Sequence, residues 1–240
     1  MSELSYQETL RYNRQIMLKA VDFDGQETLK DSRMLIVGLG GLGCAAAQYL
    51  ATAGVGHLTL LDFDTVSLSN LQRQVLHNDS RLEMPKVRSA QLALQQLNPH
   101  IKIQTIDKQL SETELSDVVT QFDVILDCTD NVDIRNSLDR CCEQHKIPLV
   151  SGAAIRFEGQ VSVFSYQPNT PTYRTLSRLF GDSTLSCVEA GIMAPVVGIV
   201  GSIQALEAIK VRLNIGKNLC GRLLLIDGLT MSVRELKLPI

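Results

Sequence analysis

The sequence predicts an α/β protein in which a Rossmann-like, mostly parallel sheet with flanking helices is continued by antiparallel strands in the C-terminal half. Two observations predict the parallel half. A buried apolar strand, Met34–Val37, runs directly into a glycine-rich turn and a helix, and strands then alternate with helices as far as Val150. A third observation predicts the rest: from Gly159 onward single apolar residues alternate with smaller ones, as in half-buried strands.

The glycine-rich turn has the spacing G-x-G-x-x-G, formed by Gly38, Gly40 and Gly43, with Gly41 as an additional glycine. The residues that follow, 44–53, are rich in alanine and leucine and predict a helix. Glycines here permit a tight turn and close approach of the backbone to a ligand, and the helix N-terminus offers free N–H groups and a positive dipole. We therefore expect a cradle for phosphate groups. The alternative is a turn whose glycines serve packing alone.

At 240 residues the chain is long enough for one large core, and we expect a single domain over 1–240. Its expected parts are an N-terminal helical arm (1–30), a nucleotide-binding core (31–150), a crossover loop (167–190) and a helix with closing strands (191–240). The net charge of −3 lacks the basic excess of nucleic-acid binders. The longest near-apolar run, Ala190–Ile203, is too short to span a bilayer, and no apolar signal-peptide stretch opens the chain. We expect a cytoplasmic protein with no nucleic-acid or membrane partner.

Periodicity predicts the elements of the parallel half. Ser2–Met17 is expected to form a polar helix, and Gly25–Asp31 to lead into the first strand. Apolar runs predict the remaining strands at 58–61, 101–106, 124–127 and 148–150. Pro85 predicts the first position of a helix, because proline suits that position and apolar residues then recur at helical spacing. A further helix is expected after Asn131.

The C-terminal half is predicted in the same way. Val161 and Val163 mark a half-buried strand, and Gln167–Cys187 is long and loop-like. A loop of that length in a compact domain is often a lid or a binding segment. Gly191–Leu213 predicts a helix, whose small residues would permit close packing, and the last strands are expected at 222–227 and 231–238.

Polar residues follow the predicted parallel strands where the strands end. Asp62 and Asp64 follow one strand, and Thr129 and Asp130 follow another. Open α/β sheets bind ligands at this edge, so we expect these residues to converge with the glycine turn. Asp62 lies 19 residues beyond the last glycine of the turn, where Rossmann proteins place the acid that binds a ribose, and its charge disfavours a 2′-phosphate. For Thr129 and Asp130, capping of the next helix is the alternative.

Two cations lie in the same part of the sequence. Arg73 belongs to the polar, irregular segment 67–74, and Lys86 lies in the first turn of a predicted helix. A cation opposes the helix dipole there, and a bound anion would reverse that effect. The alternative is that each is a solvated surface charge.

Six cysteines and four histidines show neither a C-x-x-C pair nor metal-ligand spacing, so no zinc site is visible in the sequence. Further motifs accompany the glycine turn. The full set comprises Gly38–Gly43, Asp62-x-Asp64, Ser69-Asn70-Leu71-Gln72-Arg73-Gln74, Pro85-Lys86, Cys128-Thr129-Asp130-Asn131, Arg11-Tyr12-Asn13-Arg14-Gln15 and Ser186–Pro195. Together they resemble the adenylation core of the ubiquitin-activating superfamily, and within it the MoeB/ThiF/HesA family, over nearly the whole chain.

The resemblance implies an ATP-dependent adenylyltransferase. ATP would lie with its phosphates on the glycine turn and its ribose on Asp62. The C-terminal glycine of a small ubiquitin-like sulfur carrier that ends in Gly-Gly would attack the α-phosphate, giving an acyl-adenylate and pyrophosphate. The motifs are most similar to the molybdopterin-synthase branch of the family, which implies a MoaD-like carrier and molybdenum-cofactor biosynthesis.

The resemblance also implies roles for single residues. Asp130 would hold Mg²⁺, Arg73 and Lys86 would contact phosphates with help from Asn70, and Arg14 would reach in from the second subunit of a homodimer. The catalytic residues would be Arg14, Arg73, Lys86 and Asp130. The nucleotide-binding residues would be Gly38, Gly40, Gly41, Gly43, Asp62, Asp64, Ser69, Asn70, Leu71, Gln72, Arg73, Lys86, Asp130 and Asn131.

The sequence departs from the MoeB-like members of the family, which usually carry a zinc site on two C-x-x-C pairs. Thr172-Tyr-Arg-Thr175 stands in place of the first pair, and the sequence ends at Ile240 before the second. We therefore expect adenylation without zinc. Cys187 is a candidate reactive thiol, because ThiF-like relatives use a cysteine on this segment, whereas other members pass the acyl-adenylate to a separate sulfur donor.

Other functions remain open at this point. A ThiF-like enzyme would activate a carrier of the thiamine pathway. An NAD-dependent oxidoreductase would explain the glycine turn and Asp62, but not Arg73, Lys86 and Asp130 together. A non-catalytic homologue that binds a carrier would be consistent with the loss of the zinc ligands.

Overall fold

The computed structural model describes residues 3–180 and 190–240, and in them one sheet of eight strands in the order β3-β2-β1-β4-β5-β6-β7-β8. The strands are β1 Arg33–Val37, β2 His57–Leu61, β3 Lys102–Ile106, β4 Val124–Asp127, β5 Leu149–Ile155, β6 Glu158–Phe164, β7 Arg222–Asp227 and β8 Ser232–Lys237. Strands β3, β2, β1, β4 and β5 pair in parallel. Strands β6, β7 and β8 continue the sheet antiparallel. The predicted fold class is confirmed.

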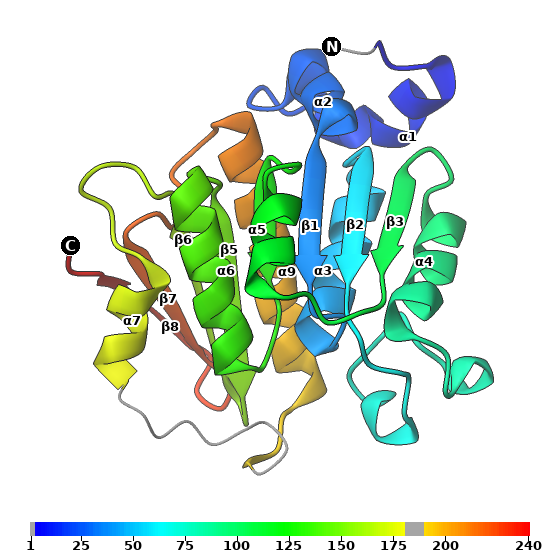
Figure 1. Cartoon of the computed structure of the whole chain (residues 1–240). Coiled ribbons are helices and arrows are strands. Elements are labelled where there is room, and N and C mark those ends of the chain that lie inside the picture. The colour runs from blue at the N-terminus through cyan, green and yellow to red at the C-terminus, as the bar shows by residue number, and fades with distance from the viewer. Residues whose placement is uncertain (1–2, 181–189) are drawn as a thin grey trace.

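Helices cover both faces of the sheet (Figure 1). They are α1 Tyr6–Ile16, α2 Asp22–Asp31, α3 Gly41–Thr52, α4 Lys86–Leu97, α5 Glu112–Val119, α6 Val132–His145, α7 Tyr173–Phe180 and α9 Ala194–Leu213. Helices α3, α4 and α9 form one hydrophobic core with the sheet, and α5, α6 and α7 form another on the opposite face. The apolar residues of the parallel strands are therefore buried on both sides, as in doubly wound sheets.

Three helices differ from the sequence-based expectation. Gly25–Asp31 was expected only to lead into β1, but α2 occupies it, with just Gln26 and Leu29 buried, which is too sparse a pattern to reveal a helix. Helix α5 was not expected, although Ser111 and Glu114 form a capping box at its start. Helix α7 occupies part of the segment interpreted as loop-like.

Two helix starts also differ. Pro85 precedes α4 with a φ of −53° and a ψ of 130°, as the N-cap rather than as the first helical residue. Helix α9 begins at Ala194, three residues later than expected, because the N–H of Arg156 donates to Gly191 and the N–H of Met193 donates back to Arg156. These two hydrogen bonds hold residues 191–193 against the loop between β5 and β6 in a non-helical conformation.

Helix α9 packs closely on α3, which directly follows the glycine turn. A Cβ atom at Gly201 would lie 2.3 Å from the carbonyl oxygen of Leu42, and one at Gly41 would lie 2.6 Å from Val197 Cγ2. The expected close packing of small residues is confirmed at Gly201. At Gly198 a Cβ would meet open space. By length and composition α9 could cross a membrane, but a buried core helix passes the same test, and α9 also packs on β5 and β6.

Candidate nucleotide-binding site

The glycine turn connects β1 to α3 at the carboxyl end of the parallel strands. Gly38 has a φ of +90°, and a Cβ there would lie 2.8 Å from the carbonyl oxygen of Cys128. A Cβ at Gly43 would lie 1.8 Å from the carbonyl oxygen of Gly38. Side chains are therefore excluded at both positions. The turn also contacts the chain that follows β4, as the predicted convergence requires.

Helix α3 begins at Gly41 with Gly40 as its N-cap, and no side chain caps it. The N–H groups of the first helical turn lack intrahelical acceptors. Within residues 3–180 and 190–240, no backbone carbonyl accepts from the N–H groups of Gly41, Leu42 or Gly43. Free N–H groups at the positive end of a helix dipole form a binding site for a phosphate.

Asp62 faces the glycine turn. Its Oδ2 accepts from the N–H of Leu39 at 2.6 Å, and its Oδ1 accepts from the N–H of Asp64 at 2.9 Å. Burial raises the pKa of this carboxyl, while the charge of Lys86 and the two N–H groups oppose the rise. Each carboxylate oxygen can accept a second hydrogen bond, so Asp62 can hold the turn and still bind a ribose hydroxyl.

Lys86 lies at the first position of α4, and its side chain is 8% exposed. Its Nζ contacts Asp64 Oδ2 at 2.7 Å, and the Asp64 side chain is largely exposed. A solvated surface charge is therefore excluded for Lys86. Its ammonium lies at the start of a helix, where the dipole opposes it and the Asp64 carboxylate offsets that effect.

The segment between β2 and α4 contains the other predicted phosphate contacts. Its first turn is fixed by the side chain of Asn70, whose Oδ1 accepts from the N–H of Ser67 at 3.2 Å. Arg73 is half-buried, and its Nη1 donates to the Ser69 carbonyl at 3.1 Å. Arg73 is thus tied to its own turn, with guanidinium donors left for a ligand. Ser69 and Gln72 are exposed, and Leu71 is half-buried.

The chain after β4 is held by a buried ion pair. Arg135 Nε lies 3.7 Å from Asp127 Oδ2, and Arg135 Nη2 donates to the carbonyls of Thr129 and Gly152. The Thr129 hydroxyl donates to Asp127 at 2.8 Å. Burial opposes the charge of Arg135, but Asp127 and the Tyr173 hydroxyl outweigh it and raise the pKa of the guanidinium.

Asp130 follows the residues held by the Asp127–Arg135 ion pair and is exposed at the carboxyl ends of the parallel strands. Asn131 caps α6, because its Oδ1 accepts from the N–H of Ile134 at 3.0 Å. The capping role that the sequence left open for Thr129 and Asp130 therefore belongs to Asn131, and the Asp130 carboxylate is available for a ligand. Sequence reasoning missed Asp127 and Arg135, because their mutual burial depends on tertiary structure.

Gln74 is a further residue that sequence reasoning left without a role. It is 3% exposed, and its Oε1 has no hydrogen-bond partner in the part of the chain that the structure describes. Its amide approaches Gly40, where a Cβ would lie 3.7 Å from Gln74 Nε2. The described residues therefore leave one buried acceptor unpaired next to the glycine turn.

Two cavities lie near the parallel strands. One of about 120 Å³ opens at the carboxyl ends of β1 and β2 and is lined mainly by apolar side chains, namely Val37, Leu61, Phe63, Leu110, Leu115 and Ile134. The other, of about 490 Å³, lies beside the edge strand β3, and none of the predicted site residues lines it.

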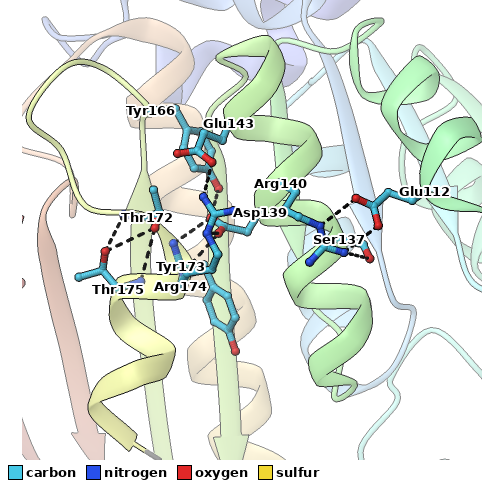
Figure 2. Close-up of polar contacts among 10 residues, drawn as sticks. All are labelled: Glu112, Ser137, Asp139, Arg140, Glu143, Tyr166, Thr172, Tyr173, Arg174 and Thr175. Carbon is cyan, nitrogen blue, oxygen red and sulfur yellow. Dashed lines mark hydrogen bonds and ion pairs between the residues drawn. The ribbon is translucent and has the colours of Figure 1, made fainter.

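Two predicted residues do not join this site within the chain. Arg14 is exposed on α1, which packs on α2 at the amino ends of the parallel strands, opposite the site (Figure 1). Cys187 lies outside the described residues. Where the family's first cysteine pair would stand, the hydroxyls of Thr172 and Thr175 lie 3.4 Å apart and contact each other (Figure 2).

A family model described as the ThiF family matches residues 12–239, so this chain belongs to the ThiF family. It is 73% identical over 239 residues to the molybdopterin-synthase adenylyltransferase of Haemophilus influenzae, covering 100% of this chain and 98% of that protein. It is 61% identical over 238 residues to the Escherichia coli enzyme of the same name, covering 99% and 96%. A solved structure of PaaA has a TM-score of 0.84 at 26% identity, covering 99% of this chain and 76% of that one. These relatives confirm the predicted family and enzyme class.

Proposed function

We propose that this protein uses ATP to adenylylate the C-terminal glycine of a small MoaD-like sulfur carrier, releasing pyrophosphate, in molybdenum-cofactor biosynthesis. The names of the two full-length relatives support this reaction. The observation that carries the proposal is the convergence of three strand ends. The free N–H groups of α3, Asp62 with the neighbouring Lys86–Asp64 ion pair, and the chain before Asp130 all lie at the carboxyl ends of the parallel strands.

Each part of the site suits one part of ATP. The N–H groups at the start of α3 would bind phosphate oxygens, and Asp62 would accept a ribose hydroxyl. The apolar cavity beside β1 and β2 would take the base. Lys86 and Arg73 would stabilise the charge that develops on the departing pyrophosphate, since electrostatics and positioning supply most of the catalysis of phosphoryl-group chemistry.

Magnesium is the expected metal, and Asp130 would hold it. Its carboxylate is exposed at the sheet edge beside the phosphate cradle. Proteins commonly hold Mg²⁺ with one or two carboxylates together with substrate phosphates. When bound there, the ion would neutralise phosphate charge.

The proposed assembly is a cytoplasmic homodimer in which Arg14 completes the site of the partner subunit. Support comes from the position of α1 at the amino ends of the parallel strands, away from the site of its own chain, and from the solvent exposure of Arg14. The partners would be a carrier ending in Gly-Gly and a separate sulfur donor. The candidate thiol, Cys187, would then not be needed for adenylation itself.

The test is ATP–pyrophosphate exchange with purified carriers that end in Gly-Gly. We expect exchange with a MoaD-like carrier and its loss in Asp130→Asn, with an unchanged melting temperature. Asp117→Asn, an exposed aspartate on α5, is the matched control and should remain active. Exchange only with a thiamine-pathway carrier would reassign the substrate. Absence of exchange with every carrier would support a non-catalytic, carrier-binding role.

A further inference from the structure

His77 is a buried histidine in the segment between Arg73 and Lys86. It is 6% exposed. Its Nε2 lies 3.1 Å from the carbonyl oxygen of Leu39, and its Nδ1 lies 2.9 Å from the hydroxyl of Ser89. Leu39 belongs to the glycine turn and Ser89 to the first turn of α4. One imidazole therefore connects three segments, each of which contributes a predicted phosphate contact.

The contacts of His77 define its protonation. A carbonyl oxygen can only accept, so Nε2 must carry a hydrogen and donate it to Leu39. Burial lowers the pKa of His77, and the charges of Lys86 and Arg81 lower it further, against the effect of the Leu39 carbonyl. The ring is therefore neutral near pH 7, and Nδ1 accepts from the hydroxyl of Ser89.

A neighbouring thiol raises the question of a nucleophile. Cys44 Sγ lies 3.7 Å from His77 Nε2, and a cysteine beside a histidine can be activated for covalent catalysis. Cys44 is fully buried, however, and burial raises its pKa to about 12. The thiol stays protonated and out of reach of a substrate, so the histidine serves the glycine turn instead.

The peptide groups of Leu39 are held on both sides. Its N–H donates to Asp62 at 2.6 Å, and its carbonyl accepts from His77 at 3.1 Å and more weakly from the Cys44 thiol at 3.4 Å. Glycines flank Leu39 and place little restriction on the backbone. These contacts therefore restrict the part of the turn that leads directly into the free N–H groups at the start of α3.

We propose that His77 is a positioning residue of the nucleotide site, which fixes the carbonyl of Leu39 and so orients the N–H groups that bind phosphate. The proposal rests on the proposed function, because it assumes that a nucleotide phosphate binds there. It predicts that the Nε2–H donor matters for nucleotide binding and that the contact with Ser89 alone does not suffice.

Two substitutions separate the ring nitrogens. His77→Gln places an amide near the position of Nε2 and keeps a donor for Leu39, whereas His77→Asn places it near Nδ1 and keeps only the contact with Ser89. The first measurement is amide hydrogen exchange in the glycine turn of the nucleotide-free protein. The second is the pair of KM for ATP and kcat in pyrophosphate exchange.

We expect His77→Asn to speed amide exchange in the turn and to raise KM for ATP on the order of tenfold, which is the effect of one lost hydrogen bond. His77→Gln should stay within about threefold of the wild type in both measurements. If His77→Asn behaves like the wild type, or if Gln is no better than Asn, the proposal is wrong.

Two further outcomes are informative. Should His77→Asn fail to fold, Ser89→Ala removes the other support of the ring and should raise KM severalfold, and an unchanged KM would refute the positioning role. Should the wild type show no pyrophosphate exchange, the proposed function fails. The amide-exchange comparison would still decide whether His77 holds the glycine turn.

Discussion

Gln74 is the residue at which the folded chain leaves a buried acceptor without a partner beside the phosphate cradle. A buried acceptor of this kind costs about 1–3 kcal/mol of stability in the ligand-free protein. Such a cost is typical of binding sites, where a ligand donor completes the hydrogen bond. The burial of the Gln74 amide is therefore a structural feature of the site that the sequence motif alone does not show.

We predict that Gln74→Met maintains or raises the melting temperature and weakens nucleotide binding. Methionine has a similar length and removes the unsatisfied acceptor, so the fold loses nothing, whereas the ligand loses a hydrogen bond worth on the order of tenfold in affinity. Calorimetry with a non-hydrolysable ATP analogue and thermal denaturation measure the two effects. Gln96→Met, at an exposed position on α4 outside the predicted site, is the control. A less stable variant with unchanged affinity would assign Gln74 a structural role.

At the scale of elements, α7 is attached to α6 by one buried carboxylate (Figure 2). Asp139 is fully buried and accepts from the Tyr166 hydroxyl at 2.8 Å and from the N–H groups of Tyr173 and Arg174 at 2.9 and 3.3 Å. The Arg174 guanidinium lies 3.2 Å from the same carboxylate and also contacts Glu143. A side chain of α6 thus caps α7 and neutralises its arginine.

Asp139→Asn should destabilise the protein. The amide cannot accept from every one of these donors, and the part-exposed Arg174 loses its buried counter-charge, so we expect a loss of about 2 kcal/mol. For a chain of this length that corresponds to a fall of roughly 5 °C in melting temperature. Arg140 also lies on α6, and Arg140→Gln, which breaks its exposed ion pair with Glu112 of α5, should leave the melting temperature unchanged. Equal effects of the two substitutions would contradict the anchoring role of Asp139.

The difference between expected and observed elements has a physical pattern. The strands and the helices α3, α4, α6 and α9 were predictable, because their signals are local, in apolar periodicity and glycine or proline positions. Helix α7 was not, because its cap is Asp139, more than thirty residues away in the sequence. The same reason explains the site: Gly38 and Asp62 stand in a recognisable local pattern, whereas Asp127, Arg135 and Gln74 acquire their burial only in the folded chain.

At the scale of the whole molecule, helix α1, which carries Arg14, lies at the amino ends of the parallel strands, opposite the predicted site (Figure 1). We predict that it acts in the partner subunit of a homodimer. Arg14→Ala and Asp130→Asn proteins should each be inactive alone, but mixing them should restore about a quarter of the sites, because each mixed dimer contains one intact composite site. The measurement is pyrophosphate exchange after subunit mixing that mass spectrometry has verified. Inactive mixtures would show that Arg14 does not act across an interface.

The anchoring of α7 by Asp139 has a consequence for how the protein depends on its chemical surroundings. A carboxylate and its hydrogen-bond donors hold this junction, and a chelator such as EDTA competes for none of them. Because the proposed reaction uses Mg²⁺, removal of divalent ions should stop it. The contacts between α6 and α7 should stay intact under the same treatment. In a protein whose corresponding helix depended on a structural zinc, the same treatment would confound inactivity with unfolding. The contacts of α7 with Asp139 are made by protein groups alone.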